Sequence, residues 1–117
     1  ISEFDGFIFV TPEYNHGVPG AFKNAFDLLA VEWMRKAIAF ISYGADGGVR
    51  AVEQWRQIVT MMEMLDVRQT VSLSMFWDFG PDGFGPLERR SQELAAVLDA
   101  VEAATAMTLA AKATQAA

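Results

Sequence analysis

The residues best suited to chemistry are concentrated in one stretch, TPEYNHGVPG, at residues 11–20. Glu13, Tyr14, Asn15 and His16 follow one another and offer a carboxylate, a phenol, an amide and an imidazole. Such groups can bind a polar ligand, but residues such as Asn15 also form ordinary turns. The stretch therefore has two interpretations, a plain connection between two elements or a ligand site.

A second stretch, SYGADGG at residues 42–48, contains the glycines that close approach of the main chain to a ligand requires. These glycines do not form G-x-G-x-x-G, and the Lys-Ser/Thr pair of a phosphate-binding P-loop is missing. The chain also has a single histidine, His16, no cysteine and no G-x-S-x-G motif. We therefore expect no Rossmann fingerprint, no catalytic triad and no metal site.

The two stretches together suit a flat, partly polar ring. Such a ring needs backbone N–H and C=O groups along its edge and an aromatic or apolar wall against its face. Pro12, Tyr14 and Asn15 from the first stretch and Tyr43 and Gly44 from the second supply those parts.

The elements that would position these residues alternate along the chain. Short apolar runs predict strands, and apolar residues at helical spacing predict helices. In order, the pattern predicts a strand at 4–10, a helix from about 19, a strand at 37–43, a helix at 49–65, a weaker strand at 70–75 and a helix from about 87. This alternation predicts an α/β fold with a parallel sheet and helices on both faces. Ligands bind at the carboxyl ends of such strands, where both stretches lie.

Several other residues have mainly structural interpretations. Trp33, Trp55 and Trp77 are expected to be structural or to lie at an interface. The inner face of the last helix is expected to consist of Leu94, Val97, Leu98, Val101 and Thr105. The segment 88–90 is expected to be a solvated first turn. The aromatic segment 76–84 could cover a ligand or meet a second subunit.

Length and composition limit the class of protein. The chain has 117 residues, 52% of them hydrophobic, which is enough for a single domain with a packed core. Its net charge of −6 argues against nucleic acid as a partner. No unbroken apolar run approaches the ~18–20 residues that span a bilayer, so we expect no membrane association. The absence of cysteine fits a cytoplasmic protein.

Two motifs in the chain resemble those of the NADPH-dependent FMN reductase family, which includes quinone, chromate and azo-dye reductases. They are P-E-Y-N-x-x-x-P-G-x-x-K-N, starting at Pro12, and S-Y-G-x-x-G-G-x-R-A, starting at Ser42. The similarity covers about residues 5–57. It implies a flavodoxin-like fold and an enzyme that transfers hydride from NADPH or NADH through FMN to quinone, flavin, azo or metal-oxyanion acceptors.

The resemblance also assigns the site residues. It implies that the flavin carries the chemistry, so no side chain is catalytic. His16 and Arg50 are expected at the substrate rim, and a homodimer or homotetramer is implied. The residues expected to bind the cofactor are Pro12, Glu13, Tyr14, Asn15, Ser42, Tyr43, Gly44, Gly47 and Gly48.

One departure from the family is large. Its members begin with a strand, a phosphate-binding loop, a helix and a second strand, and this chain has none of these. We therefore expect residues 1–117 to be one flavodoxin-like domain that is incomplete at its N-terminus. Two alternatives stay open, namely a non-enzymatic electron carrier or FMN-binding module and a degenerate scaffold without flavin.

Overall fold

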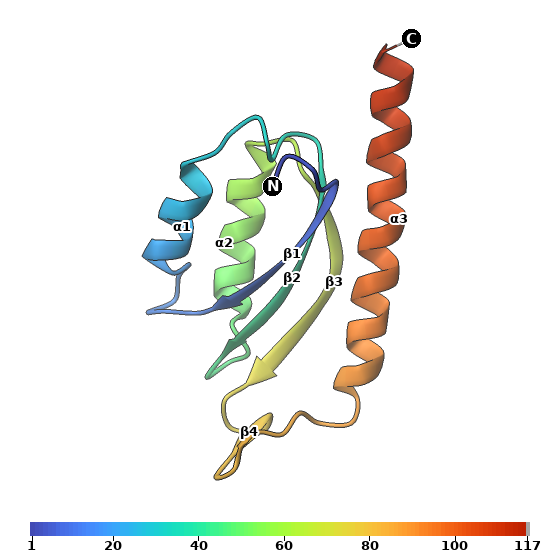
Figure 1. Cartoon of the computed structure of the whole chain (residues 1–117). Helices are drawn as coiled ribbons and strands as arrows, with labels where there is room; N and C mark the ends of the chain where they lie inside the picture. Colours follow the sequence, from blue (N-terminus) through green and yellow to red (C-terminus); the bar gives the residue numbers. More distant parts are fainter. Residues whose placement is uncertain (117) are drawn as a thin grey trace.

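A computed structural model describes residues 1–116 of the chain. Three parallel strands, β1 (Gly6–Pro12), β2 (Ala37–Gly44) and β3 (Leu65–Ser74), form a sheet in the order β1-β2-β3. Helices α1 (Gly20–Asp27) and α2 (Val49–Thr60) cover one face, and α3 (Arg90–Ala116) covers the other (Figure 1). The structure confirms the predicted three-layer, flavodoxin-like arrangement.

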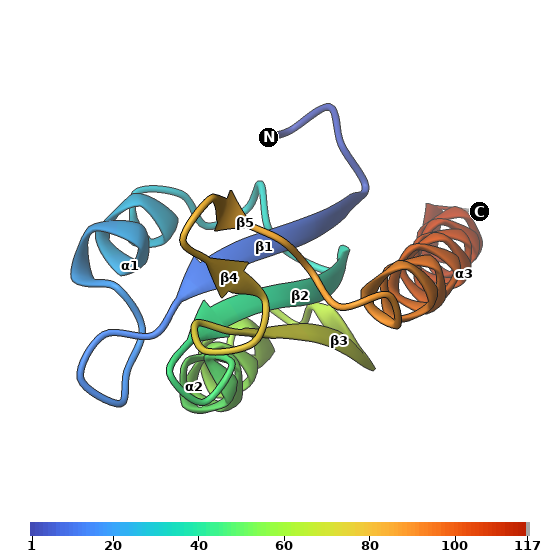
Figure 2. The ribbon, with the colours of Figure 1, turned by 90° about the horizontal axis from the view of Figure 1, so that it is seen from below.

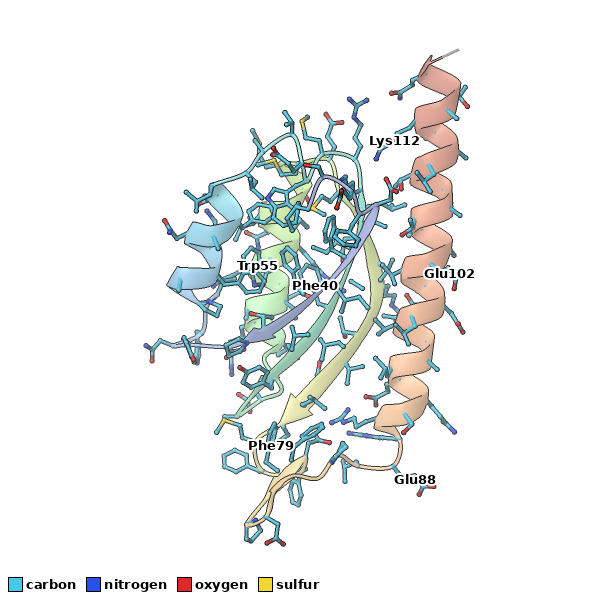
Figure 3. All side chains as sticks on the ribbon, in the orientation of Figure 1. Phe40, Trp55, Phe79, Glu88, Glu102 and Lys112 are labelled. Atoms are coloured by element: carbon cyan, nitrogen blue, oxygen red, sulfur yellow. The ribbon has the colours of Figure 1, made fainter. Side chains whose placement is uncertain are left out.

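An aromatic core fills the space between the sheet and helices α1 and α2. Phe9 of β1 contacts Phe26, Trp33 and Trp55, with ring centroids 5.4 Å apart for the Phe9–Trp55 pair. Phe40 of β2 and Trp55 lie between the two layers in Figure 3. The indole N–H of Trp33 donates to the carbonyl of Phe26 at 3.0 Å, so its polar group is satisfied. The predicted structural role of Trp33 and Trp55 is confirmed.

The opposite face of the sheet carries small side chains and lets α3 approach closely. Ala37 and Ala39 of β2 pack in one cluster with Val97 and Ala104 of α3. At Gly6 the approach is so close that an added Cβ would lie 2.3 Å from the Thr105 Oγ1. Glycine at position 6 therefore leaves room for the Thr105 side chain where β1 crosses α3.

The predicted inner face of α3 is only partly right. Val97 is buried, and Val101 packs against the same cluster. Leu94 and Leu98 were also expected there but are 39% and 47% exposed. Ala100 and Ala104 pack with this cluster as well.

Helix α3 also has membrane-spanning length. The segment Arg90–Gln115 is long and apolar enough, by length and composition, to cross a bilayer, with a mean hydropathy of 1.5 over 18 residues. The search for unbroken apolar runs did not detect this segment. Its hydropathy comes largely from alanines that lie between charged residues, and these charged residues interrupt any apolar run.

The second helix and third strand have different bounds from those predicted. Helix α2 ends at Thr60 instead of Leu65, and β3 begins at Leu65 and is the longest strand, with ten residues. The Leu65 N–H donates to the Lys36 carbonyl at 2.9 Å and so starts the pairing with β2. Charged residues such as Asp66 and Arg68 fit this strand because its outer edge is unpaired in the described chain.

The aromatic segment after β3 contains a small hairpin that the sequence did not reveal. Strands β4 (Phe79–Gly80) and β5 (Gly83–Phe84) pair antiparallel, and their two phenyl centroids lie 5.2 Å apart. Figures 1 and 2 place this hairpin beyond the carboxyl edge of the main sheet.

A buried ion pair ties this hairpin to α3. The fully buried carboxylate of Asp78 accepts hydrogen bonds from the N–H groups of Ser74 and Leu87 and from the guanidinium of Arg90. The bond from Arg90 is the largest cause that holds the pKa of Asp78 far below its ordinary range. Because the Arg90 side chain is 10% exposed, its predicted place in a solvated turn was wrong.

Candidate functional site

The two chemically interesting stretches lie side by side at the carboxyl edge of the sheet. The parallel register sets Thr11 opposite Ser42 and Pro12 opposite Tyr43. The Glu13 N–H extends this pairing and donates to the Tyr43 carbonyl at 3.1 Å. The strands therefore bring together residues that are about thirty positions apart in the sequence, as predicted.

The first loop contains a tight two-residue turn. The backbones of Tyr14 and Gly17 exchange two hydrogen bonds, each of 3.0 Å. Asn15 and His16 between them have positive φ angles of 49° and 66°. This combination is typical of a type I′ turn, a geometry that Asn tolerates well. The turn leaves the side chains of Tyr14, Asn15 and His16 exposed at the edge of the sheet.

The second loop is shaped by two glycines and a buried serine. The Ser42 hydroxyl donates to the Gly47 carbonyl at 2.6 Å. Gly48 has a φ of 75°, and a Cβ there would lie 2.8 Å from the Ser42 Cβ and 2.9 Å from the Tyr43 main chain. The loop thus folds back on its own strand before α2 begins, a path that only glycine permits at position 48.

A carboxylate connects the two loops through the start of α2. Glu13 accepts a hydrogen bond from the Arg50 N–H at 3.0 Å and pairs with the Arg50 guanidinium at 2.5 Å. The same guanidinium contacts Asp46, also at 2.5 Å. Burial alone would raise the pKa of Glu13, but the hydrogen bonds from Arg50 outweigh it and lower that pKa. Glu13 is therefore ionised at neutral pH and acts as a link between loops.

The groups that remain open at this edge suit a flat polar ligand. Within residues 1–116, the backbone N–H groups of Asn15, His16, Ala45 and Asp46 donate no hydrogen bond to the protein. The exposed phenol ring of Tyr14 lies in the same loop. Free N–H groups next to an aromatic ring can bind the edge and the face of a heteroaromatic group at the same time.

The loop after β3 joins the same edge. The Met75 N–H donates to the Gly44 carbonyl at 2.9 Å, and the Ser74 hydroxyl contacts the Ala45 carbonyl at 3.4 Å. Met75, Phe76 and Trp77 are largely exposed there. An apolar surface therefore flanks the two polar loops.

The predicted site residues differ in how open they are. Pro12 and Tyr43 are half-buried beside the exposed turn, and Gly44 is buried. The functional groups of Glu13, Ser42 and Arg50 bind other protein groups. Gln54 of α2 was missed, although it contacts the turn through the His16 carbonyl and the Val18 N–H. The only signal for it was its spacing of four residues from Arg50, which puts both on one face of the helix.

A basic cavity at the opposite, amino end of the strands is a weaker candidate. Its volume is about 620 Å³, and Arg35, Lys36 and Lys112 line it. All three cations already have protein partners. Arg35 contacts Glu63 and Gln115, Lys36 donates to two main-chain carbonyls, and Lys112 pairs with Asp5. In the described residues, no three His, Asp or Glu side chains form a metal-binding cluster. The carboxyl edge is therefore the better candidate.

Known proteins are similar in sequence to this region. Residues 1–78 match the NADPH-dependent FMN reductase family. The NAD(P)H-dependent FMN reductase ntnL of Nectria sp is 43% identical over 76 residues, which are 65% of this chain and 38% of that protein. The NAD(P)H:quinone oxidoreductase of Solanum tuberosum is 35% identical over 111 residues, which are 88% of this chain and 57% of that protein. The chain thus spans only part of the length of these relatives.

A solved structure shares the fold. The flavoenzyme NAD(P)H:(acceptor) oxidoreductase FerB of Paracoccus denitrificans superposes with a TM-score of 0.65 over 84% of this chain and 61% of its own. Its sequence identity is 24%, so this likeness supports the flavodoxin-like fold alone.

Proposed function

The chain belongs to the NADPH-dependent FMN reductase family, and on this basis we propose that it is part of an NAD(P)H-dependent flavin oxidoreductase. Its cofactor would be FMN, its reductant NADPH or NADH, and its acceptor a small molecule such as a quinone or a flavin. The observation that supports this best is the pair of family motifs, which meet at the carboxyl edge and present open N–H groups there.

The residues of this edge fit the ring portion of FMN. When bound, FMN would accept a hydride and pass electrons to the acceptor, and the protein would supply orientation and electrostatics. In this proposal the open N–H groups of Asn15, His16, Ala45 and Asp46 meet the polar edge of the ring. Such preorganised donors would stabilise negative charge on the reduced ring.

Other predicted cofactor-binding residues would act by shaping the loops. Gly47 and Gly48 allow the turn into α2, and the Ser42 hydroxyl holds that turn from below. Glu13 and Arg50 fix the spacing of the two loops. Because Arg50 is already paired with two carboxylates, its role in this proposal is to hold the loops and not to bind the FMN phosphate.

The proposal has a direct test in the protein produced from its complete coding sequence. We expect it to bind FMN, with a dissociation constant measurable by quenching of flavin fluorescence, and to oxidise NADPH when a quinone is added. A protein that takes up no FMN would refute the proposal. Bound FMN without NAD(P)H oxidation would favour an electron carrier instead.

Two further properties belong to the same proposal. The exposed aromatic side chains after β3, next to the site, favour a homodimer or homotetramer in which this surface is covered. The absence of cysteine is consistent with the reducing cytoplasm. Gel filtration with light scattering and cell fractionation would test these two points.

A further inference from the structure

The turn at the site holds a conformation that its residues do not prefer. Asn15 and His16 are consecutive L-residues with positive φ, at 49° and 66°. Asn and His tolerate this region better than most residues, yet two in succession without glycine are unusual. Such a conformation persists when surrounding groups impose it, and it is often found at ligand sites. The question is which group imposes it.

Gln54 is the side chain that contacts the turn from outside. Its Nε2 donates to the His16 carbonyl at 2.9 Å, and its Oε1 accepts from the Val18 N–H at 3.1 Å. Gly17 lies between these two groups, and a Cβ there would be 3.1 Å from the Gln54 Oε1. The glycine thus leaves room for the amide, which binds the backbone on both sides of it.

Helix α2 therefore holds the loop at two points. Arg50 binds Glu13 before the turn, and Gln54 binds the end of the turn, four residues further along the helix. Residues four apart lie on the same face of a helix, so one face of α2 supports the loop. Of the two contacts, only that of Gln54 acts directly on the turn.

We propose that Gln54 is a positioning residue that fixes the Asn15–His16 turn at the rim where the nicotinamide of NAD(P)H approaches. Gln54 would act through the turn and would not contact the ligand itself. This inference rests on the proposed function for its ligand. The contact of Gln54 with the turn can be tested without any ligand.

The test compares Gln54→Leu with Gln57→Leu in the protein produced from its complete coding sequence. Gln57 is an exposed glutamine on the same helix and serves as the matched control. Losing two hydrogen bonds should speed amide hydrogen exchange at Gly17 and Val18 by about tenfold in Gln54→Leu only. The KM for NADPH should also rise about tenfold, which corresponds to ~1.4 kcal/mol, while kcat should change by less than about twofold.

A second substitution separates positioning from general damage. His16→Gly creates Asn-Gly, the pair most favoured in a type I′ turn, so the turn should then need less support. When Gln54→Leu is added to His16→Gly, the amide exchange rates at Gly17 and Val18 and the KM for NADPH should change by less than about twofold relative to His16→Gly alone. Equal effects of Gln54→Leu in both backgrounds, or an effect no larger than that of Gln57→Leu, would overturn the proposal. Failure of the wild type to bind FMN would instead refute the proposed function, while the exchange data would still report on Gln54.

Discussion

At the scale of single residues, Glu13 shows how a motif residue can hold two loops of a candidate site together. It is predicted to bind the cofactor, and in the structure its side chain is 8% exposed and accepts hydrogen bonds from the start of α2. Charge-assisted bonds of this kind are roughly twice as strong as neutral ones. The motif spacing identified the residue, but the direction of its side chain depends on Arg50, which lies 37 positions away.

We expect Glu13→Gln to weaken FMN binding by about tenfold, because the amide cannot replace the ion pair that holds the two loops together. Since folding lowers the pKa of Glu13, its ionised carboxylate stabilises the protein above pH ~4.3, the pKa of an unfolded glutamate. This contribution is lost as the pH falls below that value. Fluorescence titration with FMN at pH 7 measures the first effect. Glu102→Gln, an exposed glutamate on α3, should leave the affinity unchanged.

At the scale of elements, Asp78 and Arg90 hold the β4–β5 hairpin against the start of α3. Asp78→Asn leaves the largely buried Arg90 guanidinium with Glu93 as its remaining carboxylate partner. We therefore expect the free energy of unfolding to fall by about 1.5–3 kcal/mol, the usual range for a lost hydrogen bond to a charged group. Urea denaturation at pH 7 measures this change. Asp82→Asn, an exposed aspartate in the same hairpin, is the matched control and should have little effect.

The same pair predicts how stability depends on pH. The pKa of Asp78 is strongly depressed in the folded protein, so the unfolded chain binds a proton there first as the solution is acidified. The wild type should therefore lose stability as the pH falls below ~3.9, the unfolded pKa of aspartate. In Asp78→Asn the free energy of unfolding should fall less steeply with decreasing pH in this acid range. Equal slopes of unfolding free energy against pH for the two proteins would contradict this account.

The contact between β1 and α3 gives a second prediction for elements. Gly6→Ala places a methyl group against the Thr105 Oγ1, and overpacking of this kind typically costs about 1–3 kcal/mol. Thr105→Ala removes the obstructing atom and should restore most of the loss. A double-mutant cycle of unfolding free energies measures the coupling. If the two losses are simply additive, the close approach does not limit stability.

The elements also show what could be predicted from the sequence. Strands β1 and β2 were recognised because both are buried apolar runs, and the meeting of their loops followed from parallel pairing. Strand β3 was shortened in the prediction because its exposed edge admits charged residues that hide the apolar pattern. The place of Arg90 could not be predicted, because its burial depends on a carboxylate twelve positions earlier in a hairpin with little local signal.

At the scale of the whole molecule, the largest side chains at the carboxyl edge are exposed. Met75, Phe76 and Trp77, which follow β3 next to the open loops, and Phe84 of the hairpin are all exposed. Exposed aromatic groups of this kind are typical of subunit contacts. The net charge of −6 acts against self-association, since two identical acidic chains repel each other.

These opposing forces predict how an oligomer would respond to mutation and salt. Trp77→Asp should shift the protein toward the monomer in sedimentation velocity, because it places a charge in the apolar contact. Leu28→Asp is the matched control, because Leu28 is 76% exposed and Trp77 is 73% exposed. Leu28 lies at the end of α1, so this substitution should not shift the protein toward the monomer. Raising the salt concentration from 0.01 to 1 M shortens the screening length from about 30 to about 3 Å and should strengthen association of the wild type. Dissociation at high salt would instead indicate that complementary charges, and not the aromatic surface, hold the subunits together.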